Sequence, residues 1–280
     1  MQILLASPSG FCGGVKSTIE QLKDVLAENR SSGVPVYCYN YPVHNTHVIQ
    51  ELESLGLKII TALSEIKEQG ILAISAHGVS PDIIAKAKDL GMTILDTTCP
   101  KVSYAQHTAR KLYDEGYRVL VLGDQNHVEV KGIAGACDGN IEVISGSGQV
   151  PAITAGEKIA LIAQTTQNEP EFDRAAAAIK AVTNNFTAIN TICSATHSRQ
   201  KAALDIAGQV DIMIIIGDTK SANTKRLLQL CGDIVTSYQI QSAGDLKAEW
   251  FTGVKKAGIT AGASTPKKII DEVIEYIAGL

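Results

Sequence analysis

Short apolar segments alternate with amphipathic segments along almost the whole chain. Twelve apolar runs have the length of β-strands, and most are apolar on both faces, as in parallel sheets covered by helices. These runs are residues 3–6, 34–38, 57–60, 71–74, 93–96, 118–122, 141–144, 158–162, 187–191, 211–216, 234–237 and 258–260. Segments between them predict helices at 14–29, 45–55, 81–90, 102–115, 169–183, 197–207, 221–231 and 266–279. The alternation predicts an α/β fold with mainly parallel sheets.

The composition narrows the class of protein. Of the 280 residues, 45% are hydrophobic and 19% are charged, which excludes a disordered chain. The net charge of −4 and the 5% of aromatic residues provide neither a basic field nor stacking platforms for nucleic acid. The start, MQILLASPSG, lacks the basic region of a signal peptide, and no later apolar run could span a bilayer. We therefore expect a soluble cytoplasmic protein.

Three of the six cysteines share one context, because each follows an apolar strand and precedes a helix. They are Cys12 in ILLASPSGFCGGV, Cys99 in TILDTTCPKV and Cys193 in AINTICSATHS. The separations are 87 and 94 residues, and 99 residues when the count runs from Cys193 through the C-terminus to Cys12. This spacing predicts three similar small α/β domains arranged around a pseudo-threefold axis and a central cavity. The expected domains are 13–98, 99–192, and 193–280 together with 1–12.

Each third of the chain also contains two polar loops that directly follow apolar strands. The candidate functional residues in these loops are His44, Asn45, His77, His127, Glu129, Thr165, Thr166, Ser221, Asn223 and Ser264. In parallel sheets, ligands bind outside the carboxyl ends of the strands, which is where these loops lie. Most of these residues are neutral donors at helix starts and suit an anion such as phosphate. Glu129 would repel phosphate and is better suited to donating a proton, with its pKa raised by burial.

The kind of metal site that the three shared-context cysteines could form depends on how many thiolates lie close together. No C-x-x-C pair or zinc-finger spacing occurs, and disulfides are not expected in a long cytosolic chain. Soft thiolates favour an iron–sulfur cluster or zinc over hard cations. Three converging thiolates without a fourth suggest an iron–sulfur cluster with one open iron, which can act as a Lewis acid toward a substrate oxygen. Cys38, Cys137 and Cys231 lack the shared context, and we expect them to be buried and inert.

Eight short motifs, in this order, resemble those of 4-hydroxy-3-methylbut-2-enyl diphosphate reductases. They are GFCGGV, PVHN, SAHGVS, DTTCP, NHVEV, QTT, ICSAT and TAGAS, and the match runs from residue 3 to about residue 270. The resemblance implies a trefoil of three α/β domains around an oxygen-sensitive [4Fe–4S] cluster. It also implies that Cys12, Cys99 and Cys193 are the cluster ligands.

The same resemblance implies roles for the loop residues. Glu129 and Thr165 match the residues that deliver a proton near the substrate hydroxyl, with Thr166 beside them. The family often has Ser where Ala222 stands, so one contact to phosphate is expected to be missing. The expected substrate-binding residues are His44, His77, His127, Thr165, Thr166, Ser221, Ala222, Asn223 and Ser264. The implied reaction is a reductive dehydroxylation that gives isopentenyl and dimethylallyl diphosphate, with electrons from a donor such as ferredoxin or flavodoxin.

Two other functions use the same residues. One is a zinc-dependent hydrolase, although the chain has no local H-x-x-x-H or C-x-x-C chelate. The other is a non-catalytic three-lobed protein that binds phosphorylated small molecules, with the thiols packing its centre. Brown protein that contains iron and sulfide after purification without oxygen would distinguish the iron–sulfur enzyme from both alternatives.

Overall fold

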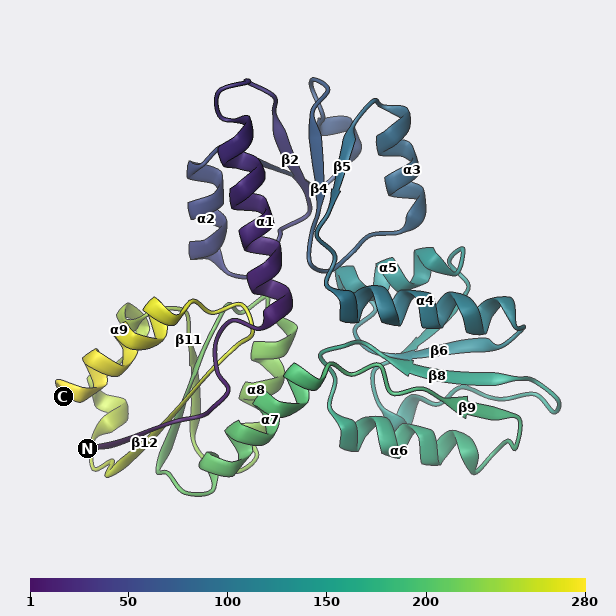
Figure 1. Cartoon of the computed structure of the whole chain (residues 1–280). Coiled ribbons are helices and arrows are strands. Elements are labelled where there is room, and N and C mark those ends of the chain that lie inside the picture. Colours follow the sequence, from purple (N-terminus) through teal and green to yellow (C-terminus); the bar gives the residue numbers. More distant parts are fainter. The chain divides into compact units, whose positions relative to one another are not determined.

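The computed structural model describes residues 1–280 as an α/β protein with three sheets of four parallel strands (Figure 1). The strands are β1 (Gln2–Leu5), β2 (Val36–Tyr39), β3 (Leu57–Ile60), β4 (Ile71–Ile74), β5 (Thr93–Asp96), β6 (Arg118–Leu122), β7 (Ile141–Ile144), β8 (Ile159–Ala163), β9 (Phe186–Ala188), β10 (Ile212–Ile216), β11 (Ser237–Ile240) and β12 (Lys256–Ala261). The predicted α/β fold class with mainly parallel sheets is confirmed, and the three sheets are alike; their arrangement as a trefoil stays a prediction.

Nine α-helices connect these strands. They are α1 (Gly13–Asn29), α2 (Thr46–Ser54), α3 (Pro81–Asp89), α4 (Pro100–Asp114), α5 (Val128–Ala136), α6 (Glu169–Lys180), α7 (Ser194–Ala207), α8 (Ala222–Gly232) and α9 (Lys267–Ala278). Four short 3₁₀ turns add η1 (Leu63–Glu65), η2 (Ser147–Gln149), η3 (Ala243–Asp245) and η4 (Ala248–Phe251). No helix is both long enough and apolar enough to cross a membrane.

All three sheets have the same strand order. The first sheet runs β3-β2-β4-β5, and the second runs β7-β6-β8-β9. The third runs β11-β10-β12-β1, so the first strand of the chain takes the place that β5 and β9 take in the other sheets. Its register pairs Ile3 with Ala257 and Leu5 with Ile259 in parallel. Each sheet therefore contains three consecutive strands and a fourth that directly precedes one of the shared-context cysteines.

The strands are apolar on both faces because helices cover both faces. In the second sheet, Val119 and Val121 of β6 pack with α4 and α5, whereas Leu120 and Leu122 pack with α6. Figure 1 shows α4 and α5 on one side of this sheet and α6 on the other. The third sheet repeats the arrangement, with α9 against one face and α7 and α8 against the other.

The chain folds into two compact units. Unit 1 comprises Met1–Lys16, His44–Val48 and Ser194–Leu280, and unit 2 comprises Ser17–Val43 and Ile49–Cys193. Unit 1 contains the third sheet, and unit 2 contains the first and second sheets. The expected division into 13–98, 99–192, and 193–280 with 1–12 stays a prediction.

Several predicted elements differ from the structure. Helix α5 was not predicted, because its nine residues VEVKGIAGA contain two glycines and no continuous polar face. Helices α4 and α7 begin at Pro100 and Ser194, earlier than the predicted 102 and 197, so each starts directly after a cysteine. The strand expected at 234–237 lies at Ser237–Ile240, and the one expected at 187–191 ends at Ala188.

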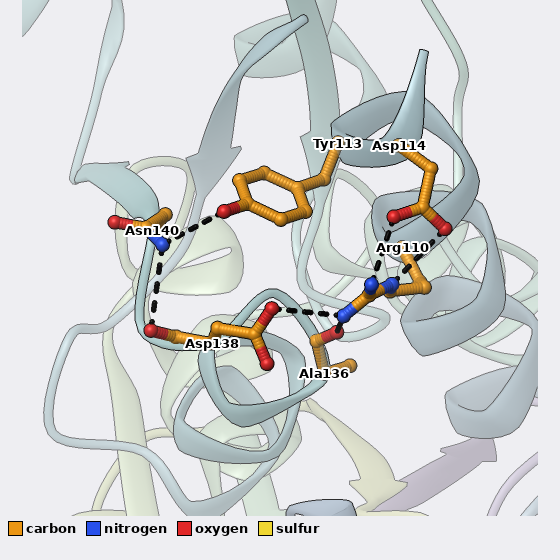
Figure 2. Close-up of polar contacts among 6 residues, drawn as sticks. All are labelled: Arg110, Tyr113, Asp114, Ala136, Asp138 and Asn140. Carbon is orange, nitrogen blue, oxygen red and sulfur yellow. Dashed lines mark hydrogen bonds and ion pairs between the residues drawn. The ribbon is translucent and has the colours of Figure 1, made fainter. Parts of the chain in front are cut away.

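Polar contacts join the ends of α4 and α5 (Figure 2). Arg110 donates to the Asp138 carboxylate over 3.0 Å and to the Ala136 carbonyl over 3.3 Å. The Asn140 amide donates to the Tyr113 hydroxyl over 2.9 Å. These contacts lie at the C-terminal end of α5, and the candidate residues His127 and Glu129 lie at its N-terminal end.

Candidate functional site

The polar loops of each sheet follow its two central strands. The loops after β2, β6 and β10 contain His44, His127 and Ser221, and the loops after β4, β8 and β12 contain His77, Thr165 with Thr166, and Ser264. In each sheet the chain leaves these two neighbouring strands toward opposite edges. The carboxyl ends of such strands form a topological switch point, where parallel sheets bind ligands. The candidate residues therefore occupy equivalent positions in all three sheets.

Each shared-context cysteine is tied to one of these loops by the same hydrogen bond. The backbone N–H of Cys99 donates to the carbonyl of Ala76 over 3.0 Å, and that of Cys193 donates to Thr165 over 2.9 Å. The backbone N–H of Cys12 donates to the carbonyl of Ala263 over 3.1 Å. The residues that follow these three acceptors are His77, Thr166 and Ser264. The fold thus repeats the pairing of a cysteine with a candidate polar residue three times.

These three cysteines differ from the other three in exposure and in their position relative to helices. Cys12, Cys99 and Cys193 are free and half-buried, and each stands directly before a helix. The Cys12 sulfur accepts the backbone N–H of Val15 over 3.5 Å.

The remaining three cysteines, Cys38, Cys137 and Cys231, are fully buried in the structure. Burial raises the pKa of Cys38 to about 12, and of Cys137 and Cys231 to about 11. Such thiols do not ionise near neutral pH, so they contribute to packing.

The donor chemistry of the half-buried cysteines fits an iron–sulfur cluster with three protein ligands. Neither unit by itself gathers three or more His, Cys, Asp or Glu side chains into a metal-binding group. Cys12 belongs to unit 1, whereas Cys99 and Cys193 belong to unit 2. The assignment of these cysteines as ligands therefore rests on their equivalent positions, their exposure and the softness of sulfur.

Glu129 and Thr165 form a buried hydrogen-bonded pair in unit 2. The Glu129 side chain is 1% exposed. The Thr165 backbone N–H donates to Glu129 Oε1 over 2.7 Å, and the Thr165 hydroxyl donates to Oε2 over 2.9 Å. Burial raises the pKa of Glu129 to about 7, although both hydrogen bonds from Thr165 act in the opposite direction. Near neutral pH this carboxyl can therefore hold a proton and release it.

The N-terminal turns of α5 and α8 are built alike. His127 Nδ1 accepts the backbone N–H of Glu129 at the start of α5, and Ser221 Oγ accepts that of Thr224 at the start of α8. Glu129 and Asn223 are thus the second residues of equivalent helices.

Asn223 lacks the partner that Thr165 gives to Glu129. Its side chain is 4% exposed, yet neither Oδ1 nor Nδ2 has a hydrogen-bond partner. An unsatisfied buried amide costs about 1–3 kcal/mol. The amide is therefore well suited to a polar ligand at the N-terminus of α8.

Two further candidate pairs lie within the units. In unit 1 the Ser264 hydroxyl donates to the His44 carbonyl over 2.8 Å. In unit 2 the rings of His77 and His127 pack edge to face, with centroids 5.7 Å apart. The Thr166 hydroxyl accepts from Gln164 over 3.0 Å. Ala222, the first residue of α8, has only its backbone to offer a ligand.

Some structural residues of the site were not found by sequence reasoning. The buried Arg199 donates to the Gly10 carbonyl over 2.8 Å and 3.1 Å and so holds the loop that leads to Cys12. Asp218 accepts from the Thr46 hydroxyl over 3.0 Å. The repeated pair Gly-Asp after β6 and β10 was the one sequence signal for Asp218, whereas nothing local indicates the partner of Arg199.

Similarity to known proteins extends along nearly the whole chain. The family model described as LytB protein matches residues 3–278. The chain belongs to the LytB family. Two LytB relatives named 4-hydroxy-3-methylbut-2-enyl diphosphate reductase come from Citrifermentans bemidjiense and Alkaliphilus oremlandii. They are 38% and 36% identical to this chain, cover 100% of it, and are themselves covered over 98% and 100% of their lengths.

A solved structure extends the similarity to the fold. The E-1-hydroxy-2-methyl-but-2-enyl-4-diphosphate reductase from Plasmodium falciparum matches with a TM-score of 0.92 and 28% sequence identity. The match covers 100% of this chain and 87% of the Plasmodium chain. A second structure is described as (E)-4-hydroxy-3-methyl-but-2-enyl diphosphate reductase, the terminal enzyme of the non-mevalonate pathway. It has a TM-score of 0.71 and 35% identity over 100% of both chains. The resemblance seen in the eight motifs is confirmed by this LytB membership.

Proposed function

We propose that the protein reduces 4-hydroxy-3-methylbut-2-enyl diphosphate to isopentenyl diphosphate and dimethylallyl diphosphate. Membership of the LytB family and the names of the relatives support this oxidoreductase activity. The buried pair of Glu129 and Thr165 is the single observation in the structure that carries it, because a neutral carboxyl beside a hydroxyl is what proton delivery requires.

The proposed cofactor is a [4Fe–4S] cluster whose protein ligands are Cys12, Cys99 and Cys193. When bound, this cluster supplies single electrons and an iron that the protein leaves open. The six cysteines of the chain are all free, which supports a reducing compartment, and we propose the cytoplasm.

The proposed substrate-binding residues recognise the diphosphate group. Ser221 and Asn223 offer a helix N-terminus and an unsatisfied amide, and Ala222 adds a backbone N–H. The other residues assigned to substrate binding are His44, His77, His127, Thr165, Thr166 and Ser264. Histidine and hydroxyl donors bind phosphate oxygens without the fixed positive charge of lysine, so release of an equally charged product is not hindered.

Glu129 and Thr165 are proposed to move the proton. The Thr165 backbone N–H fixes Oε1 of the carboxyl, which leaves Oε2 facing the Thr165 hydroxyl. When Glu129 is protonated at Oε2, it can donate to the Thr165 oxygen while the Thr165 hydroxyl donates its own proton to the substrate hydroxyl. The leaving oxygen then departs as water rather than as hydroxide, and Glu129 is left ionised.

The overall reaction consumes two electrons and two protons. One carbon–oxygen bond breaks, one carbon–hydrogen bond forms, and the oxygen leaves as water. The electrons come from a small redox protein, for which ferredoxin or flavodoxin is the proposed class.

The variant Glu129→Gln tests the proposed proton delivery. Glutamine keeps the size and one acceptor of the side chain but cannot supply an acidic proton, so turnover should fall about 10²–10⁴-fold. Substrate binding and the iron and sulfide content should remain those of the unmodified protein. Full turnover by this variant would remove Glu129 from the mechanism.

A further inference from the structure

The segment His44–Val48 belongs to unit 1, although the residues on both sides of it, Ser17–Val43 and Ile49–Cys193, belong to unit 2. Two long-range hydrogen bonds attach this segment to unit 1. The Thr46 hydroxyl donates to Asp218 Oδ2 over 3.0 Å, and the Ser264 hydroxyl donates to the His44 carbonyl over 2.8 Å. The partners are 172 and 220 residues apart in the sequence, so tertiary structure rather than local chain geometry sets this attachment.

Asp218 is more deeply buried, and makes one more contact, than its turn requires. Its Oδ1 accepts the Lys220 backbone N–H over 2.8 Å, and its carbonyl accepts that of Ser221 over 3.0 Å. Asp124 makes the same two bonds, to Asn126 and His127, in the equivalent turn after β6. Asp124 is exposed, whereas Asp218 is 6% exposed and also binds Thr46. The turn therefore explains an aspartate at both positions but not the burial of Asp218.

A buried carboxylate beside an anion site needs a reason, because it repels the anion. Burial lowers the pKa of His44, and the positive charges of Lys220 and Lys225 lower it further, whereas the negative charge of Asp218 raises it. His47 is the other titratable group of the segment. Asp218 is thus the group that favours a positively charged His44 imidazole, the form that binds an anion most strongly.

We propose that Asp218 and Thr46 are positioning residues that hold His44 at the N-terminal turn of α8, where it acts with Ser221 and Asn223 on an anionic substrate. This inference rests on the proposed function, because it assumes that the turn binds a diphosphate. The two residues have different roles in this proposal. The Thr46 hydroxyl attaches the segment, and the Asp218 carboxylate supplies the compensating charge.

The variant Asp218→Asn isolates the charge. An asparagine can accept from the Lys220 N–H through Oδ1 and donate to the Thr46 oxygen through Nδ2, so both contacts can persist without the charge. Titration of the six histidines by ¹³C NMR in anaerobically prepared protein, with His44 assigned through His44→Asn, should show a lower His44 pKa in this variant. Asp124→Asn, the matched turn, should leave the His44 titration unchanged. Equal His44 titration in all three proteins would overturn the role of the charge.

The variants Thr46→Val and Thr46→Ser isolate the attachment. Valine removes the donor to Asp218 and should weaken binding of inorganic pyrophosphate, measured by calorimetry, about 3- to 5-fold, the range of one partly exposed polar interaction. Serine keeps the hydroxyl and should restore the unmodified affinity. Equal affinity of the valine variant and the unmodified protein, or equal losses for valine and serine, would overturn the role of Thr46.

The two experiments also separate this inference from the proposed function. If the unmodified protein does not bind pyrophosphate, the assignment of the anion site fails, and the His44 titration still decides whether Asp218 acts on His44. If the unmodified protein binds pyrophosphate and the Asp218 and Thr46 variants match it in both measurements, the inference fails while the proposed function stands.

Discussion

At Glu129 the fold buries a carboxyl group almost completely and gives it one partner residue. Desolvation by burial raises the pKa of Glu129 to about 7, and the hydrogen bonds from Thr165 act against this rise. Asn223 holds the equivalent place in the third sheet, but no threonine lies opposite it, because Ala263 occupies the position of Thr165. One repeated backbone position thus holds a carboxyl, proposed to deliver a proton, in the second sheet and an amide, proposed to bind the ligand, in the third.

The raised pKa of Glu129 predicts a measurable dependence of stability on pH. A carboxyl whose pKa rises from 4.5 to about 7 on folding favours the folded state fully below pH 4.5, and that contribution is lost as pH rises through 7. Relative to Glu129→Gln, which does not titrate, the unmodified protein should lose about 3 kcal/mol of unfolding free energy between pH 4.5 and pH 8. Urea unfolding of both proteins at matched iron content checks this, and parallel pH profiles would contradict it.

Substitution of a half-buried cysteine and of a fully buried cysteine should affect the iron content differently. Cys99→Ser replaces a soft ligand with a hard one, so iron and sulfide content should fall sharply in anaerobically purified protein. The matched control is Cys231→Ala, which removes a sulfur from the buried core and should leave iron and sulfide unchanged. A cluster of normal stoichiometry in Cys99→Ser would refute the ligand assignment.

At the scale of elements, α5 positions His127 and Glu129 through unusually close contacts with its neighbours. A Cβ at Gly135 would lie 2.1 Å from the Ser80 Cβ and 3.0 Å from its Cα, just before α3. A Cβ at Gly132 would lie 2.5 Å from the Gln106 Nε2, the flexible end of an α4 side chain. Gly132 and Gly135 made α5 hard to predict from the sequence, and they are also the residues that allow it to pack closely against Gln106 and Ser80.

This packing predicts different effects for two chemically identical substitutions. Gly135→Ala should destabilise the protein by about 1–3 kcal/mol, because the clash involves atoms at and near the backbone. Gly132→Ala should be close to neutral, because the Gln106 side chain can move and alanine favours the helix by up to about 1 kcal/mol. Thermal unfolding of the two variants checks the contrast, and equal effects would show that the contact with Ser80 does not limit the packing of α5.

At the scale of the whole molecule, apolar strands that are covered on both faces made the fold predictable. Continuous runs such as IMIII in β10 and IALIA in β8 are unambiguous, and their alternation with helices predicts parallel sheets. The strand after α8 was misplaced because the exposed Ile234 belongs to the turn that precedes β11 rather than to the sheet. Helix α5 was missed because its burial leaves it without a polar face.

The residues of the candidate site also fall into those that the sequence predicts and those that only the fold reveals. Residues that follow a strand could be found from the repeated order of strand and polar loop, which led to Cys12, Glu129 and Ser264. Asp218 and Arg199 act through partners far away in the sequence, so only the folded chain reveals their contacts. The site assignments themselves remain predictions that the variants above test.

The most direct measurement is anaerobic incubation of the purified protein with 4-hydroxy-3-methylbut-2-enyl diphosphate and reduced viologen, followed by identification of the products by mass spectrometry. We expect isopentenyl and dimethylallyl diphosphate, each one oxygen atom lighter than the substrate, from brown protein that contains iron and sulfide. Release of phosphate or pyrophosphate by a colourless zinc-containing protein, or unchanged substrate from protein replete in iron and sulfide, would contradict the proposed reductase.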